Sequence, residues 1–399
     1  MVSCGFVRLP LIGYSMNDTV DIFVSLLRRA VTVTDENIDL TDADLEALYS
    51  LSDFHDLTHI VYYELEKLGK LPVEGEIREK LSKRYDRAVF NDIRRKGVIA
   101  EIRELLNGAG IPFILLKGAV LMDLYPQSWM RTSSDVDVLI REEDLKSVDK
   151  LFAGAGIKRN GESAHDITYT SRADFKVEIH HSLIEERVLP EAVKLLEKVW
   201  EYSSPIKKDS AEYVMRDSFF YFYHLAHMAK HIKEKGCGVR FFADQWVLDH
   251  RAVSDAGAGK ELVTLAGLET FEKRVRELSE VWFSRAPKSG QAAELEAHIM
   301  RSGLYGTVDQ MVTARTVKTG KRGIGYYFRR VFIPSKSMKE YYPVLKKYPL
   351  LMPFYRIKRV FKLVRPDVRT RTIKEMKAEK AVDEGSRSTY EKMISGLGI

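Results

Sequence analysis

The sequence predicts an α/β (α+β) fold in which a small mixed sheet lies between N-terminal helices and a C-terminal helical bundle. Two observations lead to this prediction. Apolar residues recur at helical spacing over residues 17–107 and again over 190–303. Between these regions the chain has short apolar runs separated by helical segments, which is typical of strands and helices that alternate in one compact unit.

Length and composition are those of an ordinary globular protein. The chain has 399 residues, of which 45% are hydrophobic and 30% charged, so disorder, a collagen-like repeat and a disulfide scaffold are excluded. It has only two cysteines, Cys4 and Cys237, which indicates a reducing compartment. No run approaches the roughly 18 apolar residues of a membrane span, and the start shows no signal-peptide pattern. We therefore expect a cytoplasmic protein, at most peripheral at the inner membrane surface.

Residues 1–107 are predicted to form an N-terminal helical region. Val20, Phe23 and Leu27 are spaced to share one helix face, and the pattern of Asp53–Leu68 predicts a further helix. Two glycines at 108 and 110 then interrupt the pattern. We expect this region to end there.

Residues 108–185 are predicted to be the α/β core. The expected elements are strands at 111–116, 135–140 and 175–181 and helices at 119–125 and 142–156. A strand around Ile167 is expected to form a hairpin with 175–181, because Arg172, Ala173 and Asp174 suit a short connection.

The rest of the chain divides into a helical bundle, residues 186–305, and a basic, aromatic-rich segment, residues 306–399. Helices are predicted over 219–232 and 268–283. From Lys318 to Lys374 there are 17 Lys or Arg against two acids, a net charge of +15, so the rest of the chain carries −9 of the total +6. The last 20 or so residues are expected to form a frayed or disordered helix.

Three acids in the α/β core indicate a metal site. Asp135 and Asp137 stand two apart in the apolar run DVDVLI, so a strand places both carboxylates on one face. The two carboxylates repel each other, so a cation is needed to compensate their charge. Glu178, in FKVEIHH, supplies a third carboxylate on a later strand. Three carboxylates on neighbouring strands can hold two Mg²⁺ ions about 3.5 to 4 Å apart, an arrangement that serves phosphoryl transfer.

A phosphate-binding element is predicted upstream of these acids. The strand at 111–116 ends in Lys117-Gly118, where a helix is expected to begin. Glycine lets a phosphate approach the backbone, the helix start offers N–H groups, and lysine adds a positive charge. Arg131 is a second cation for a triphosphate, and Ser133 and Ser134 could add hydroxyl donors.

These residues resemble the nucleotidyltransferase superfamily with the DNA polymerase beta-like fold. Its members have a Gly-containing turn after a first strand, an acid-x-acid pair on the second and one more acid on a later strand. The resemblance is closer still to a bacterial subfamily described as uncharacterised nucleotidyltransferases, and it covers residues 108–183 specifically. The matching residues are Lys117, Gly118, Tyr125, Arg131, Asp135, Asp137, Glu178 and His180.

The resemblance implies that Asp135 and Asp137 bind both metal ions, Mg²⁺ or Mn²⁺, and that Glu178 completes the site and helps to deprotonate the acceptor. One departure concerns the phosphate-binding turn. The superfamily usually has Gly-Ser or Gly-Gly there, whereas Ala119 follows Gly118 in this chain. A hydroxyl contact to the donor triphosphate is therefore missing, and Lys117 and Arg131 are expected to substitute for it.

A histidine-rich helix is the second cluster with chemical potential. His224, His227 and His231 recur at i, i+3 and i+7 and share one helix stripe. Zinc ligation, as in a zinc hydrolase, is one interpretation, although no acid or cysteine joins the stripe at a convincing spacing. The favoured interpretation is a polar face on the acceptor side of the cleft, to which His180, His224, His231, Arg240 and Asp244 would contribute. Ordinary hydrogen bonding between helices is the structural alternative.

The sequence of the basic segment 318–374 is compatible with several partners. Aromatic residues alternate with cations in it, which would suit an anionic membrane surface, another polyanion or, less favoured, nucleic acid. An amphipathic helix packed on the catalytic region, with its basic face in water, is the alternative without a partner.

The predicted activity is metal-dependent transfer of a nucleoside monophosphate group from a nucleoside triphosphate to an acceptor hydroxyl or phosphate, with release of pyrophosphate. A small molecule, a glycan precursor or a protein is favoured as acceptor, because no tRNA-specific segment is visible. The rival hypothesis is a catalytically degenerate module of the same fold that binds nucleotide or nucleic acid. The missing serine after Gly118 motivates it.

Overall fold

The computed structural model describes residues 16–40, 43–163, 165–183, 189–251, 256–320, 333–342, 344–363 and 366–399. A seven-stranded sheet lies within these residues, with the strand order β3-β4-β5-β2-β1-β7-β6. Its strands are β1 (Phe113–Leu115), β2 (Asp135–Ile140), β3 (Lys158–Glu162), β4 (Asp166–Thr170), β5 (Lys176–His180), β6 (Ser203–Pro205) and β7 (Glu212–Met215).

The sheet is mixed, as predicted. Strand β2 runs parallel to β5 and antiparallel to β1, and β1 runs parallel to β7. The predicted hairpin between β4 and β5 is confirmed, with Asp174 in the left-handed region at its turn (φ 54°). Strands β3, β6 and β7 were not predicted. The two edge strands, β3 and β6, lack apolar runs because they lie at the solvent-facing margins of the sheet.

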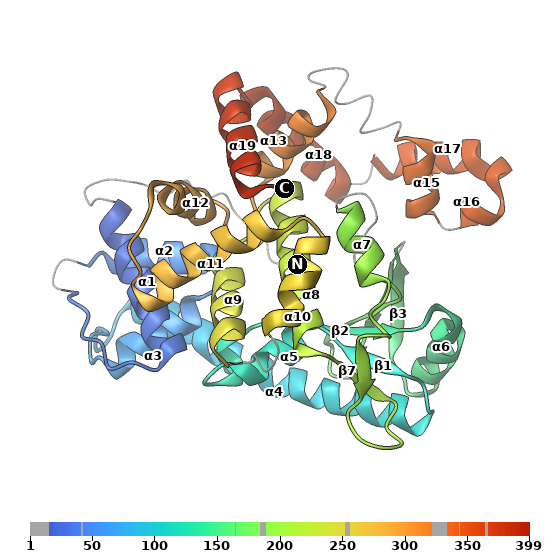
Figure 1. Cartoon of the computed structure of the whole chain (residues 1–399), viewed down its shortest axis with the longest axis horizontal. Helices are drawn as coiled ribbons and strands as arrows, with labels where there is room; N and C mark the ends of the chain where they lie inside the picture. The colour runs from blue at the N-terminus through green and yellow to red at the C-terminus, as the bar shows by residue number, and fades with distance from the viewer. Residues whose placement is uncertain are drawn as a thin grey trace.

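Helices precede, cover and follow the sheet (Figure 1). The N-terminal ones are α1 (Met16–Thr32), α2 (Leu45–Phe54), α3 (Thr58–Lys67) and α4 (Glu76–Gly108). Those within the sheet region are α5 (Gly118–Leu121), η1 (Met122–Leu124), η2 (Ser128–Met130), η3 (Glu142–Asp144), α6 (Leu145–Gly154) and α7 (Pro190–Leu196). The bundle consists of α8 (Asp217–Glu234), α9 (Val239–Arg251), α10 (Ala256–Leu265), α11 (Glu269–Ser284) and α12 (Gly290–Met300). The C-terminal ones are α13 (Val308–Thr319), α15 (Ser335–Tyr341), α16 (Val344–Lys347), η4 (Pro349–Leu351), α17 (Met352–Leu363), α18 (Pro366–Ala381) and α19 (Glu384–Leu397).

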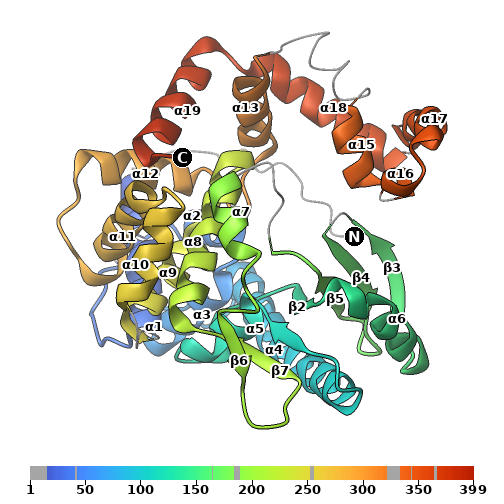
Figure 2. The ribbon, with the colours of Figure 1, turned by 45° about the vertical axis from the view of Figure 1, so that its right-hand side comes forward.

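The N-terminal helices α1–α3 share one hydrophobic core with the bundle helices α8–α12. Phe23 of α1, Val247 of α9 and Trp282 of α11 are all buried in it. Arg28 of α1 also donates a hydrogen bond to the Trp282 carbonyl oxygen (3.0 Å). The two helical regions, although far apart in sequence, therefore form one packed body beside the sheet (Figures 1 and 2).

A second core lies on one face of the sheet, between β-strand side chains and the helices α4 and α6 (Figure 2). Val136 and Val138 of β2 point into it together with Ile102 of α4 and Phe152 of α6, and all four are fully buried. This burial fixes which face of β2 is apolar. The opposite face of β2 is left for its polar residues.

Two local expectations differ from the structure. The helix predicted over Asp53–Leu68 is broken, because Asp56 adopts a left-handed conformation (φ 55°) and α3 begins at Thr58. The last 20 or so residues were expected to form a frayed or disordered helix, and the structure has the helix α19 at Glu384–Leu397. Helix α19 is capped by Asp383, and its Tyr390 hydroxyl donates to the Lys233 carbonyl oxygen of α8 (2.9 Å).

No helix among the described residues is long and apolar enough to cross a membrane.

Candidate active site

The parallel pairing of β2 and β5 brings the predicted acids together. In its register Asp137 lies directly opposite Glu178, and Asp135 lies opposite Lys176. The side chains of Asp135 and Asp137 share the face opposite to the buried valines, as the period of two requires. Sequence reasoning proposed that β2 and β5 are neighbours, and the pairing confirms it.

His180 joins these carboxylates. Its Nε2 lies 2.8 Å from Asp137 Oδ1 and 3.5 Å from Glu178 Oε2. Ligand atoms of Asp137, Glu178 and His180 lie within 4.8 Å of one another, and this is the group that could hold a metal ion in the described part of the chain. Asp135 stands beside this group and accepts a hydrogen bond from Ser133 Oγ (2.9 Å).

Lysines compensate the carboxylate charges. Lys117 Nζ lies 3.5 Å from Asp137 Oδ2, and Lys176 forms an ion pair with Glu178. Burial opposes ionisation of Asp137, but Lys117 and His180 outweigh it and hold the pKa of Asp137 well below its usual range. Burial and the neighbouring Asp137 charge raise the pKa of Asp135. The site therefore combines firmly ionised carboxylates with one carboxyl group that a further cation would help to ionise.

The Lys117-Gly118 turn follows β1 where the sequence places it. Lys117 adopts a strained left-handed conformation (φ 42°), and such strain often marks a functional position. The helix after it, α5, is only one turn long, and the N–H groups of residues 119–121 already donate to backbone carbonyls. The expected helix-start N–H groups are thus largely occupied, and the side chains around the turn remain as donors.

Ser133 lies against Gly118. A Cβ added at Gly118 would be 3.1 Å from both Cβ and Oγ of Ser133 and 3.7 Å from Nη1 of Arg131. A serine hydroxyl is therefore present beside the turn although Ala119 follows Gly118 in the sequence. Ser134, the next residue, is exposed at the rim of the same pocket.

Arg131 is held in a buried ion pair with Asp244 of the bundle helix α9. Its Nε lies 2.7 and 3.0 Å from the two carboxylate oxygens of Asp244, which also accepts a hydrogen bond from the Tyr125 hydroxyl (2.7 Å). Arg131 Nη1 donates to the Thr132 carbonyl oxygen (2.7 Å). The structure thus pairs Arg131 and Asp244, which sequence reasoning had assigned to opposite sides of the cleft.

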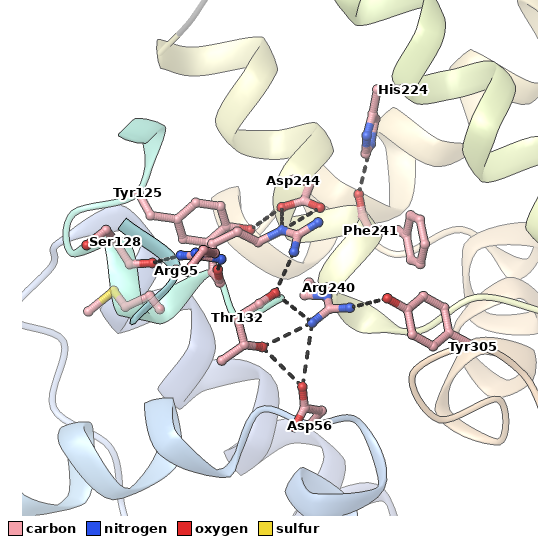
Figure 3. A network of polar contacts seen from close by, with 12 residues as sticks. Asp56, Arg95, Tyr125, Ser128, Thr132, His224, Arg240, Phe241, Asp244 and Tyr305 are labelled. Atoms are coloured by element: carbon pink, nitrogen blue, oxygen red, sulfur yellow. Dashed lines mark hydrogen bonds and ion pairs between the residues drawn. The ribbon is translucent and has the colours of Figure 1, made fainter. Parts of the chain in front are cut away.

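Arg240, one turn before Asp244 on α9, holds the same loop from a second side (Figure 3). Its Nη1 donates to the carbonyl oxygen and to Oγ1 of Thr132 (both 3.0 Å) and lies 3.6 Å from Asp56 Oδ2. Its Nη2 donates to the Tyr305 hydroxyl (2.9 Å). Arg240 of α9 and Asp56 of the α2–α3 turn therefore both contact Thr132 in the chain that leads into β2, while Tyr305 from the loop after α12 contacts Arg240.

A pocket of about 410 Å³ opens between the sheet face and helices α8 and α9, and all the predicted site residues line it. Its lining residues are Lys117, Gly118, Leu121, Arg131, Ser133, Ser134, Asp135, Asp137, His165, Asp166, Lys176, Glu178, His180, Phe220, Tyr223, His224, His227, Lys230, His231, Lys235, Arg240, Phe241, Asp244 and Tyr305.

The α8 histidines form the wall opposite the carboxylates. His227 and His231 approach each other with 3.1 Å between their Nε2 atoms, whereas His224 Nε2 lies 3.3 Å from the Phe241 carbonyl oxygen (Figure 3). Burial, and then nearby positive charge, lowers the pKa of both His227 and His231 well below the ordinary value. In the described residues these histidines gather no third zinc ligand around them. The geometry does not favour the zinc interpretation.

Several pocket residues were absent from the sequence-based site. Lys176 shares the strand face of Glu178 and His180, so the period of two could have included it. Tyr223 and Lys230 lie on the same stripe of α8 as His227, at spacings of four and three. Tyr305 has no such signal, because it reaches the pocket from the loop after α12 through tertiary packing alone.

Residues 41–284 match the sequence model of a family described as uncharacterised nucleotidyltransferase. The match covers more than half of the chain. The chain belongs to this nucleotidyltransferase family. No curated protein and no solved structure matches the chain significantly.

Membership in the nucleotidyltransferase family confirms the resemblance inferred from the motif and makes the protein a transferase. The matched range begins before α2 and ends with α11, so it contains every pocket residue except Tyr305. It also includes α2, α3 and α4, whereas the motif alone spans residues 108–183. The basic segment 318–374 lies outside it.

Proposed function

We propose that the protein transfers a nucleoside monophosphate group from a nucleoside triphosphate, bound in the pocket beside β2 and β5, to a hydroxyl or phosphate of an acceptor. The observation that carries this proposal is the register of β2 and β5. It sets Asp137 opposite Glu178 and adds His180, all facing a pocket whose other walls carry cations. We propose residues 108–185 as the catalytic core and residues 186–305 as the bundle that closes the pocket.

The donor atoms fit a hard divalent cation. Asp135, Asp137 and Glu178 offer carboxylate oxygens, which Mg²⁺ and Mn²⁺ prefer, and His180 adds an imidazole nitrogen that suits Mn²⁺. Among the residues that the structure describes, the buried Nδ1 of His180 has no hydrogen-bond partner, and its Nε2 contacts two carboxylates. These residues would hold the metal, which when bound would neutralise phosphate charge and acidify an acceptor hydroxyl.

The triphosphate would lie along the turn after β1. Lys117 and the Gly118 backbone would approach its phosphates, and Ser133 and Ser134 would donate hydroxyl hydrogen bonds. Ser133 Oγ, which lies beside Gly118, would replace the hydroxyl that Ala119 lacks. Arg131 would contribute positive charge at the pocket wall, while its ion pair with Asp244 keeps the guanidinium in place.

In the proposed reaction an acceptor oxygen forms a bond to the α-phosphorus, and the bond from that phosphorus to the β-phosphate oxygen breaks. The products are the nucleotidylated acceptor and pyrophosphate. The proton of an acceptor hydroxyl would pass to the Glu178 carboxylate, which faces the pocket, and from there to solvent. Lys117 would offset the charge that develops on the leaving pyrophosphate.

The acceptor would enter on the α8 side of the pocket. His224, His231, Arg240, Asp244 and, from the sheet, His180 line this side or support it. Burial lowers the pKa of His224 and His231, and their neutral imidazoles, with the ring of Phe241 beside them, suit an uncharged, hydroxyl-bearing group. We propose a small molecule, a glycan precursor or a protein side chain as acceptor.

Asp137→Asn tests this proposal. The purified chain is incubated with each α-³²P-labelled nucleoside triphosphate, Mg²⁺ or Mn²⁺ and a cell extract, and label transfer is followed. The wild type is expected to transfer label from at least one triphosphate, and Asp137→Asn is expected to lose roughly 100-fold or more, because both metal affinity and charge balance at the site are lost. The control is Asp123→Asn, an exposed carboxylate on η1.

Metal-dependent triphosphate binding provides a separate measurement. Calorimetry with ATP, GTP, CTP and UTP in the presence of Mg²⁺ should show binding that EDTA abolishes. Full activity of Asp137→Asn would refute the assigned site. Absence of both label transfer and metal-dependent binding would favour the degenerate binding module.

A further inference from the structure

Helix α17 and the turn η4 before it expose an apolar surface. Leu350 is 95% exposed, Phe354 61%, Ile357 57% and Phe361 71%. Leu351 and Val360 are exposed beside them. We call these six side chains the α17 apolar face. In Figures 1 and 2, α15, α16 and α17 stand together to one side of the helical body.

The apolar face points away from the rest of the protein. Phe354, Ile357 and Phe361 are spaced i, i+3 and i+7, which places them on one side of the helix. The other side packs inward, since the ring of Tyr355 lies 4.8 Å from that of Tyr342 and Met352 is only partly exposed. The apolar side of α17 therefore faces solvent, and the side that carries Tyr355 packs against the protein.

Cations flank this face on both edges. With 3.6 residues per turn, Arg356 falls on one side of the Phe354–Ile357–Phe361 stripe and Lys358 on the other. Between Glu340 and Asp367 the sequence has seven Lys or Arg and no acid. Lys346 and Lys347 of α16 extend the positive charge along the chain that precedes η4.

We propose that α17, with η4, docks in the plane of an anionic lipid surface, with the apolar face in the acyl boundary and the flanking cations at the headgroups. A helix with an apolar stripe bordered by Lys and Arg matches the chemistry of such an interface, because apolar burial and attraction to anionic headgroups act at the same depth. The long stems of Arg and Lys can follow the apolar face while their charges stay in water.

Two other occupants fit the surface less well. Nucleic acid would stack its bases on aromatic rings and pair its phosphates with cations. Leu350, Ile357 and Val360 lie within the face and offer no ring to stack on. A second copy of the chain would bring the same positive charge against itself, because no acid lies in this part of the sequence to pair with it.

Vesicle sedimentation with the full chain tests the proposal. Binding is measured to vesicles of phosphatidylcholine alone and of phosphatidylcholine with 30% phosphatidylglycerol. We expect binding to the anionic vesicles only. The triple variant F354S/I357S/F361S should weaken that binding by about 1,000-fold or more, since each of the three side chains loses apolar burial worth about 1.5 kcal/mol. The variant R356Q/K358Q should weaken it by roughly 30-fold, at about 1 kcal/mol per charge.

The matched control is F90S/I93S, which removes two side chains of α4 that are as exposed as those of α17. It should bind the anionic vesicles like the wild type. Circular dichroism confirms that each variant is folded. The proposal does not depend on the catalytic one, so label transfer in solution should survive the α17 substitutions.

Three outcomes would overturn the proposal. One is equal binding to neutral and anionic vesicles, or none to either. Another is binding of single- or double-stranded oligonucleotide that competes with vesicles and that F354S/I357S/F361S leaves intact. The last is concentration-dependent self-association, seen by sedimentation velocity without lipid and abolished by the triple variant.

Discussion

The ion pair between Arg131 and Asp244 gives the sharpest test of how the bundle holds the active site. The substitution is Asp244→Asn. The Asp244 side chain is 1% exposed and accepts three short contacts, two from Arg131 Nε at 2.7 and 3.0 Å and one from the Tyr125 hydroxyl at 2.7 Å. Asparagine keeps the shape but leaves the buried guanidinium without a counter-charge and replaces one acceptor oxygen by a donor.

Removing one partner of a buried ion pair costs about 3 to 5 kcal/mol, because the other charge remains buried and unpaired. We expect a loss of this size in the free energy of unfolding, measured by urea titration followed by circular dichroism and tryptophan fluorescence. The slope of the titration should stay unchanged if only stability is affected. The control is Glu79→Gln, which breaks the exposed Lys83–Glu79 pair of α4 and should cost no more than about 0.5 kcal/mol.

A second variant separates charge from packing. In Arg131→Met/Asp244→Leu both charges are removed, so no charge is stranded, and the double variant should be more stable than Asp244→Asn alone. A loss below about 1 kcal/mol for Asp244→Asn would refute the reasoning that this pair fixes the chain entering β2.

Three further predictions concern stability. Burial lowers the pKa of His55 to about 4, against 6.5 in the unfolded chain. The neutral His55 therefore contributes about 3 kcal/mol to the free energy of unfolding above pH 6.5, and this contribution is lost as the pH falls toward 4. His55→Gln, which keeps a donor for the Met300 carbonyl oxygen, should flatten the acid limb of the stability profile by that amount, and an unchanged limb would contradict the assignment. Gly306→Ala should cost more than about 3 kcal/mol, because φ is +79° and its Cβ would overlap the Lys235 carbonyl, whereas Gly69→Ala, at φ +63° in open space, should cost about 1 kcal/mol. Similar melting temperatures for the two glycine variants would show that the chain around Lys235 yields to the added carbon. Tyr390→Phe removes the hydrogen bond from α19 to α8 and should cost about 1 kcal/mol in urea, and no change would show that packing alone holds α19.

The sequence alone established the elements that local periodicity controls. The run DVDVLI became β2 with the predicted bounds, and its period of two placed Asp135 and Asp137 on one face. The helix predicted around the α8 histidines was likewise found, because a 3.6-residue pattern specifies a helix without reference to its neighbours. The Lys-Gly turn and the acids of the α/β core indicated the nucleotidyltransferase family, and the match to the family model then showed it.

Relations between distant segments came only from the tertiary structure. Strand register places Asp137 opposite Glu178, and the packing of α9 pairs Arg131 with Asp244. Ser133 lies against Gly118 in a loop that Arg240 and Asp56 contact at Thr132. The edge strands β3 and β6 carry no apolar signal, and the hydrogen bond from Tyr390 of α19 to the Lys233 carbonyl oxygen of α8 joins segments far apart in the sequence.

The sequence therefore determined the chemistry that this protein can present, three carboxylates, a Lys-Gly turn and a basic, aromatic-rich segment, because residue type and spacing are local properties. The tertiary structure decided which of those groups meet and which faces remain exposed, because burial and ion pairing are settled between segments more than 100 residues apart, as for Arg131 and Asp244. For the same reason the basic segment and its interleaved apolar residues were readable from the sequence, whereas only the structure shows that the apolar face of α17 is exposed.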